Sequence, residues 1–401
     1  MKILIVSPSF PYPPDKGASI RIYNLLKYLS CNNEVQLVSI QDRLIKDDDI
    51  GHLKKYCKKV YTVARKKYPR ILQFPRVVER FLRCQPFMIK YAESKEMEYL
   101  LPQITTREKF DIVQFEHSYM ARNIEFLDKY CNAKTILSLH NIASTQYYRV
   151  FNTEKNLYRK MKCVFEWVPM LSWEPSMATR FNKCVVVSET DRVLLRFLNP
   201  TLDVSVVPNG VDTKVFRPYP LNIREKNILI VGSLDYGPNA DAVKYFYGQI
   251  FPIVRETIPE AKLTIVGKDP GCDIEKLGDD PAVAVHGNVA DVRPFYEKAM
   301  ISAVAVQSGG GTRLKIVESM ALGTPVVSTA VGCEGFNVQD RLNILIANRP
   351  RDFADKIIQL FLSPDVWNKL SVEGRLLVEK QYDWEQISYR LENIYCELMT
   401  N

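Results

Sequence analysis

The sequence predicts an α/β protein made of two Rossmann-like domains with a ligand-binding cleft between them. Two observations lead to this prediction. Short apolar segments alternate with amphipathic helical patterns along the 401 residues, which is typical of parallel sheets covered by helices on both faces. The same opening also occurs twice, as Lys-Ile-Leu-Ile-Val-Ser at 2–7 and as Asn-Ile-Leu-Ile-Val-Gly-Ser at 227–233. Two first strands of this kind imply two separate doubly wound sheets.

In the N-terminal half, the strand at 2–7 is followed by a loop from Pro8 to Gly17 and by a helical pattern over 19–29. Residues 146–182 combine eight aromatic side chains with lysines and arginines, which predicts a helix or a helix pair that packs against the core. Further strands are predicted where short apolar runs recur, at 34–40, 112–115, 134–139, 184–187 and 204–207.

In the C-terminal half, the strand at 227–233 leads into a helix expected over 239–247. Residues 208–226 hold three prolines and one glycine, so we expect the domains to span 1–208 and 209–383. A last helix over 384–398, with Asp383 as its N-cap, is expected to pack back on the first domain. The other predicted strands lie at 262–266, 283–286, 301–306, 325–328 and 343–346.

Composition narrows the class of protein. Hydrophobic residues make up 46% of the chain and charged residues 25%, as in ordinary globular proteins. Without a run of about eighteen apolar residues, no membrane-spanning helix is expected. The apolar start is too short for a secretory signal, so we expect a cytoplasmic protein. Nine scattered cysteines without a CxxC pair and four scattered histidines indicate reduced thiols and no metal site.

Positive charge is concentrated in residues 51–90, which hold twelve lysines and arginines and a single acidic residue, Glu79. Tyrosine, phenylalanine and leucine side chains alternate with this charge. Such a segment suits the anionic inner leaflet of a membrane, where the protein would be peripheral. Nucleic acid is a less favoured partner, and a solvated basic helical face is the alternative without a partner.

Residues 309–318 read Gly-Gly-Gly-Thr-Arg-Leu-Lys-Ile-Val-Glu and stand between an apolar run and a helical pattern. Glycines let backbone N–H groups approach a ligand closely, and a helix N-terminus favours negative charge. Arg313 and Lys315 add two cations suited to phosphate, and Glu318 could accept hydrogen bonds from sugar hydroxyls. The segment predicts a nucleoside diphosphate site, the alternative being an ordinary tight turn. Its predicted contacts are Gly309, Gly310, Gly311, Thr312, Arg313, Lys315 and Glu318.

Five motifs together carry a family resemblance. They are the segment 207–212, the loop after Gly232, the segment 286–292, the segment 309–318 and the closing Tyr-Asp-Trp at 382–384. With these motifs in this order, the chain resembles the family-four glycosyltransferases of GT-B fold. It is most similar to a branch with GGGTR-x-K-x-x-E and with PN-x-DA, here at 238–242.

The resemblance implies a retaining, metal-independent transferase without a cofactor. It would move a hexose or N-acetylhexosamine from a UDP- or GDP-linked donor to an acceptor. Glu318 matches the second glutamate of the family's Glu–seven residues–Glu pattern and would bind the ribose, whereas Gly310 stands where the first glutamate would be. Arg313 and Lys315 would carry the diphosphate charge. The base would contact the backbone at Val289, with Asp291 capping the next helix. Further predicted donor contacts are Asn209, Gly232, Ser233 and Asn239.

In the first domain, Gly17 matches the family's glycine loop over the donor phosphate. His140 matches a strand-end histidine that faces the reacting sugar, and it joins Arg313 and Lys315 as a predicted catalytic residue. A structural role is the alternative for His140, as it is for Glu116 and His117 at the end of another strand. The predicted acceptor contacts are Lys16, Arg21, Glu116 and His117.

Two other functions remain open. A nucleotide-sugar 2-epimerase shares the architecture but would need more acid–base groups than four histidines suggest. A non-enzymatic protein that binds membrane or nucleic acid through residues 51–90 would leave the glycine segment without a purpose. For a transferase, the basic segment suggests a lipid-linked acceptor or a polysaccharide made at the inner leaflet.

Overall fold

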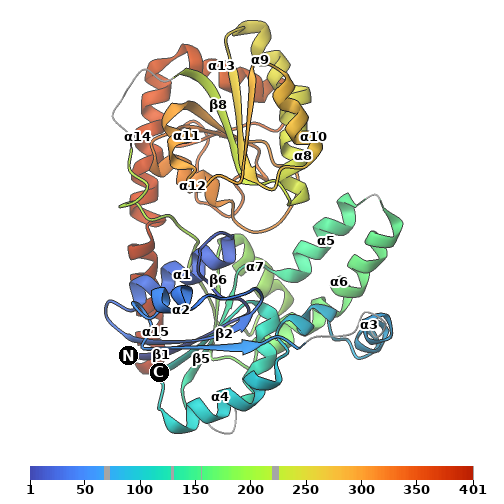
Figure 1. The fold of residues 1–401 in the computed structure, drawn as a ribbon, viewed down its shortest axis with the longest axis vertical. Coiled ribbons are helices and arrows are strands. Elements are labelled where there is room, and N and C mark those ends of the chain that lie inside the picture. The colour runs from blue at the N-terminus through green and yellow to red at the C-terminus, as the bar shows by residue number, and fades with distance from the viewer. Residues whose placement is uncertain (67–72, 128–130, 155, 219–224, 401) are drawn as a thin grey trace. The chain divides into compact units, whose positions relative to one another are not determined.

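The computed structural model describes residues 1–66, 73–127, 131–154, 156–218 and 225–400. They divide into two compact units (Figure 1). Unit 1 comprises Met1–Asn209 and Ile387–Asn401, and unit 2 comprises Gly210–Gln386. The division lies next to the boundary expected at 208/209. The last helix, α15 (Trp384–Thr400), begins in unit 2 and ends in unit 1.

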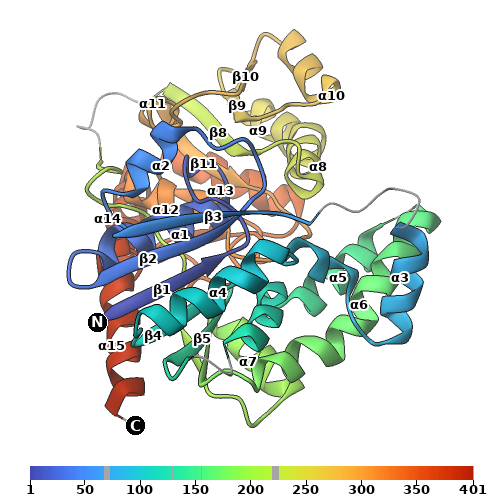
Figure 2. The same ribbon diagram turned by 60° about the horizontal axis from the view of Figure 1, so that its bottom comes forward.

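Unit 1 contains a parallel sheet of seven strands in the order β3-β2-β1-β4-β5-β6-β7. Figure 2 shows this sheet with helices on both faces. The strands are β1 (Lys2–Ser7), β2 (Glu34–Gln41), β3 (Lys59–Ala64), β4 (Ile112–Glu116), β5 (Lys134–Leu139), β6 (Lys183–Val186) and β7 (Val204–Val206). The helices are α1 (Gly17–Leu29), α2 (Asp47–Leu53), α3 (Gln73–Leu82), η2 (Phe87–Tyr91), α4 (Lys95–Arg107), η3 (Ser118–Phe126), α5 (Ala143–Thr153), α6 (Leu157–Ala178) and α7 (Glu189–Leu198).

Unit 2 repeats the plan with six parallel strands in the order β10-β9-β8-β11-β12-β13. The strands are β8 (Glu225–Ser233), β9 (Lys262–Lys268), β10 (Val283–Gly287), β11 (Ala299–Val304), β12 (Val326–Ser328) and β13 (Leu345–Ile346). The helices are α8 (Gly237–Tyr245), η4 (Phe246–Ile250), α9 (Phe251–Thr257), α10 (Cys272–Glu275), η5 (Lys276–Asp279), α11 (Arg293–Lys298), α12 (Leu314–Ala321), α13 (Pro350–Leu362) and α14 (Pro364–Gln381). The predicted fold class is therefore confirmed.

The first strand of each unit is buried on both faces, as expected for a parallel sheet. In β1, the side chains from Ile3 to Val6 have no exposed surface. In each unit the strand order reverses beside this first strand, between β1 and β4 in unit 1 and between β8 and β11 in unit 2. Ligands of doubly wound sheets bind at the carboxyl ends of the strands that flank such a reversal.

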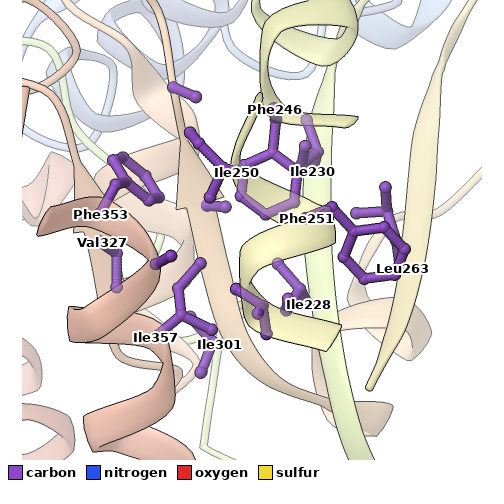
Figure 3. Packing of buried hydrophobic residues seen from close by; sticks show 14 of the residues in the cluster. Ile228, Ile230, Phe246, Ile250, Phe251, Leu263, Ile301, Val327, Phe353 and Ile357 are labelled. Atoms are coloured by element: carbon purple, nitrogen blue, oxygen red, sulfur yellow. The ribbon is translucent and has the colours of Figure 1, made fainter. Parts of the chain in front are cut away.

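One face of the unit 2 sheet packs on α9 and α13 through a large apolar cluster (Figure 3). Ile228, Ile301 and Ile357 have no exposed surface there. The cluster explains why the apolar runs of this half form strands, because each strand contributes side chains to it. Its labelled members are Ile228, Ile230, Phe246, Ile250, Phe251, Leu263, Ile301, Val327, Phe353 and Ile357.

Ile301→Ala is expected to lower the free energy of unfolding of unit 2 by about 2–5 kcal/mol, because it removes buried methyl groups and leaves a cavity. Urea unfolding followed by tryptophan fluorescence measures this, since Trp367 belongs to the same cluster. Leu376 on α14 is 52% exposed and provides the control. Leu376→Ala should change the free energy by less than about 0.5 kcal/mol, and equal losses in both variants would contradict the packing described.

The basic region 51–90 differs from the expected single interfacial segment, although its residues 67–72 lie outside the described ranges. It includes the edge strand β3, which the sequence analysis missed. Some of its charge is also paired within unit 1: Lys58 contacts Glu34 at 2.6 Å, and Arg80 contacts Glu93 at 2.5 Å. Lys59 pairs with Glu108. The helix pair expected in 146–182 is confirmed as α5 and α6, which lie side by side in both views (Figures 1 and 2).

None of the helices in the described ranges combines the length and the apolar character that crossing a bilayer requires.

Candidate functional site: a diphosphate cradle and a buried histidine–glutamate pair

The strand order of unit 2 brings three separate predicted segments together. Gly232 lies near the end of β8, and the glycine loop 309–311 follows the neighbouring strand β11. Asn239 lies on α8, which follows β8. We call the group formed by Gly232, Ser233, Asn239 and Lys315 the diphosphate cradle.

Side-chain contacts within the cradle are direct. The Nζ of Lys315 donates to Oδ1 of Asn239 at 3.0 Å, and Nδ2 of Asn239 donates to the Ser233 carbonyl at 2.9 Å. A Cβ at Gly232 would lie 2.8 Å from Nζ of Lys315 and 3.1 Å from Nδ2 of Asn239. A side chain at position 232 would therefore crowd the lysine amine in this position.

Burial sets the charge states of the cradle. Burial lowers the pKa of Lys315 to about 8, and the charge of Arg313 acts in the same direction. Burial also raises the pKa of Glu318, one turn later on α12, to about 7, against the attraction of Lys315. Among the described residues, no carboxylate lies within ion-pair distance of Lys315.

The side chain of Arg313 contacts the backbone of the glycine loop, whereas the sequence predicted a contact with the diphosphate. Its guanidinium is 9% exposed and donates to the carbonyls of Gly311 at 2.8 Å and Gly309 at 3.0 Å. Glu334, which the sequence analysis did not identify, lies 3.9 Å from it. Gly309 and Gly311 have φ of 113° and 75°, which favour glycine. Arg313 therefore holds the shape of the glycine loop, while Gly310 and Thr312 remain partly exposed beside it.

The segment expected to contact the base follows β10. Asn288 adopts φ of 54°, and its side-chain oxygen accepts from the amide of Asp269 at 3.0 Å. Val289 comes next and is half-buried. Asp291 accepts from the amide of Arg293, the first residue of α11, at 2.9 Å. The N-cap position is Val292, so Asp291 stands one residue before the capping place expected of it.

Nucleotide affinity is expected to fall as pH rises above about 8. A diphosphate favours the protonated amine of Lys315, so its pKa is higher in the complex than in the free protein. When the pH is above the pKa of Lys315 in the free protein, the amine must take up a proton as the nucleotide binds. Nucleotide affinity then decreases by up to about tenfold per pH unit. Titration calorimetry between pH 7.5 and 9.5 measures this. Lys315→Arg stays protonated throughout, and an equally steep fall in that variant would contradict the assignment.

In unit 1, the predicted residues divide into exposed and buried groups. Lys16 is exposed, and Gly17 begins α1, where a Cβ would meet nothing within 4 Å. Both are accessible to a ligand. A side chain at position 17 would meet no crowding, in contrast to position 232.

His140 and Glu116 form a close pair at the ends of β5 and β4. Nε2 of His140 lies 2.6 Å from Oε2 of Glu116, and the ring of His117 lies 3.8 Å from that of His140 between centroids. The Glu116 side chain has no exposed surface. The prediction that Glu116 contacts the acceptor is therefore wrong for the described structure, because its carboxylate is enclosed and occupied. His117 remains partly exposed, with φ of 74°.

Arg21 is also buried, although it was predicted to contact the acceptor. It is 1% exposed, and its Nη1 donates to the Pro208 carbonyl at 3.0 Å and to Oδ1 of Asn209 at 2.9 Å. The prediction is corrected: Arg21 fixes the segment that carries Asn209, itself a predicted donor contact. No local pattern indicates this contact, because the two residues are 188 positions apart.

The chain is similar to known proteins in sequence and in fold. Residues 225–363 match the family described as "Glycosyl transferases group 1". The chain is 30% identical over 300 residues to the putative glycosyltransferase YtcC of Bacillus subtilis, covering 67% of this chain and 68% of that protein. It is 22% identical over 416 residues to lipopolysaccharide 1,2-N-acetylglucosaminetransferase of Salmonella typhimurium, covering 97% and 96%. The solved sucrose-phosphate synthase of Thermosynechococcus elongatus has a similar fold, with a TM-score of 0.73, 17% identity and coverage of 100% and 99%.

Proposed function

The chain belongs to the group 1 glycosyltransferases of GT-B fold, and on this premise we propose that it transfers a hexose or N-acetylhexosamine, with retention of configuration, to a lipid-linked or polysaccharide acceptor. The donor would be UDP- or GDP-linked. The observation that carries the proposal is the diphosphate cradle, in which Lys315 reaches Asn239 over Gly232 within the matched residues. The relative that uses N-acetylglucosamine in lipopolysaccharide supports this substrate class.

In the proposed reaction, the acceptor oxygen bonds to the anomeric carbon while the bond from that carbon to the diphosphate breaks on the same face. The acceptor proton passes to the departing diphosphate oxygen. Negative charge grows on the diphosphate, so fixed positive groups lower the barrier. Lys315 and the amides of residues 309–312 would supply that charge, with the Gly17 amide assisting. Glu318 would hold the ribose, and His140 would bind the donor sugar.

The protein is proposed to meet its acceptor at the surface of an anionic membrane. Lys54 and Lys55, at the start of the basic region, are exposed, and their positive charge would be attracted to anionic headgroups. Sedimentation with vesicles that contain phosphatidylglycerol tests this: replacement of both lysines by glutamine should weaken vesicle binding. DNA binding that depends on the same lysines would instead favour nucleic acid.

A thermal-shift panel of UDP, GDP, ADP and dTDP tests the donor site. A ligand at about 100 times its Kd stabilises the fold by about 2.7 kcal/mol, so UDP or GDP should raise the melting temperature. Lys315→Ala should abolish the rise. If none of the four nucleotides changed the melting temperature, the assignment of the cradle as a diphosphate site would be contradicted.

Two further measurements address the reaction itself. NMR of the product's anomeric centre determines whether configuration is retained, and an assay in EDTA determines whether a divalent ion is needed; we expect retention and undiminished activity.

Incubation of the nucleotide-sugar without acceptor separates the enzyme from a 2-epimerase, which would change the sugar. The matched family and the named relatives are glycosyltransferases, which does not favour the epimerase.

A further inference from the structure

Three buried side chains connect the C-terminal helix to His140. The hydroxyl of Tyr395 on α15 donates to Oε1 of Gln114 at 2.6 Å. Nε2 of Gln114 donates to Oε1 of Glu116 at 2.5 Å, and Oε2 of Glu116 lies 2.6 Å from Nε2 of His140. Gln114 and Glu116 are two positions apart on β4, so they share one face of the sheet. We call this series the Tyr395–His140 chain.

The donor and acceptor groups determine the direction of each hydrogen bond in the Tyr395–His140 chain. The hydroxyl donates to the amide oxygen, and the amide nitrogen therefore faces Glu116. A carboxylate can only accept hydrogen bonds, so His140 must carry its proton on Nε2. In the neutral ring, Nδ1 then holds a lone pair. No donor among the described residues reaches Nδ1, and 8% of the His140 side chain is exposed.

Nearby charge keeps Glu116 ionised. Burial alone would raise its pKa, but the hydrogen bond from His140 and the charge of Arg21 hold the pKa below its ordinary value. Burial lowers the pKa of His140 despite the carboxylate, and it lowers that of His117 further still. The pair is therefore an anion and a neutral imidazole, which has one acceptor nitrogen left over.

We propose that Tyr395, Gln114 and Glu116 are positioning residues that hold His140 with its proton on Nε2, so that Nδ1 accepts a hydrogen bond from a hydroxyl of the donor sugar. The hydrogen bond from the donor sugar to Nδ1 rests on the proposed function, whereas the tautomer of His140 does not. Groups that orient a metal-binding histidine contribute about 10- to 100-fold, and we expect a factor of this size for a histidine that binds a sugar hydroxyl.

Nitrogen NMR of the full chain labelled with ¹⁵N-histidine tests the tautomer directly. The chain has four histidines, and replacing His52 and His286 by glutamine leaves only His117 and His140 to assign. We expect a protonated Nε2 and an unprotonated Nδ1 at His140. Glu116→Ala should abolish this preference. A proton on Nδ1 in the unaltered pair, or the same tautomer without Glu116, would overturn the proposal.

Kinetics test whether the chain serves transfer. Tyr395→Phe removes only the hydroxyl and should lower kcat about 3- to 10-fold, while Glu116→Gln should lower it about 10- to 100-fold. Nucleotide Kd should not change, because the diphosphate cradle is in unit 2. Tyr389 lies on the same helix and is 62% exposed, so Tyr389→Phe is the matched control and should leave kcat unchanged.

The two proposals fail in distinguishable ways. Equal kcat in Tyr395→Phe and Tyr389→Phe would overturn the positioning role of Tyr395. A chain without transfer activity from any nucleotide-sugar, but with the Nε2-protonated His140 that depends on Glu116, would reject the proposed function and support the tautomer.

Discussion

Lys315→Ala is expected to lower sugar transfer at least about a hundredfold, the scale of losing one fixed charge-stabilising group. The amine is held in the diphosphate cradle by Asn239 at 3.0 Å, in a position that a Cβ at residue 232 would crowd. Its charge would oppose the negative charge that grows on the departing diphosphate. Initial rates with saturating donor, together with nucleotide Kd from calorimetry, separate loss of binding from loss of turnover.

The same substitution should not destabilise the fold. A partly buried ammonium costs free energy that an uncharged side chain does not, so the free energy of unfolding should stay constant or rise. Lys244 on α8 pairs with Asp273 at the surface, and Lys244→Ala is the control that should retain full activity. Near-normal transfer by purified Lys315→Ala protein would reject the role given to this residue.

Arg313→Ala should reduce transfer by a similar factor but for another reason. The guanidinium joins the carbonyls of Gly309 and Gly311, and without it the loop loses the conformation that would present its amides to the diphosphate. Two hydrogen bonds to the loop carbonyls would also be lost, of which the one to Gly309 is buried, and a buried hydrogen bond typically contributes about 0.5–1.5 kcal/mol. We therefore expect both lower activity and a lower melting temperature.

Comparison of two arginines isolates the loop effect. Arg351 is exposed on α13, where it pairs with Asp355 at 3.3 Å, and Arg351→Ala should alter neither property. Arg313→Lys keeps the charge but lacks the planar fork that spans two carbonyls, and so should remain impaired. If lysine restored full transfer, charge alone would explain Arg313 and the loop contacts would be incidental.

The strands that sequence predicted well are those in the middle of each sheet. β1 and β8 are buried on both faces and appear as unbroken apolar runs, which parallel sheets require. β3 was missed because it is an edge strand whose ends are exposed. Lys59 begins it, and its other neighbours in sequence are also basic, so charge density masked the strand pattern.

Within the site, local contacts were easier to predict than distant ones. Gly232 and Lys315 were identified because glycines and a cation at strand ends are visible in the sequence. The role of Arg313 depends on backbone angles at Gly309 and Gly311, which the sequence does not specify. The enclosure of Glu116 and Arg21 depends on neighbours far along the chain, and Tyr395 meets Gln114 across 281 positions.

Helix α15 also bears on the order in which the protein matures during synthesis. Unit 2 is one continuous stretch, whereas unit 1 needs residues 387–401, which are made after unit 2. Ile387, Leu391 and Tyr395 have no exposed surface, so the half made first has uncovered apolar groups until these residues have been made. Exposed apolar surface in a nascent chain attracts chaperones and other unfolded chains. A chain cut short before Ile387 would therefore damage the earlier-made unit while sparing the later one.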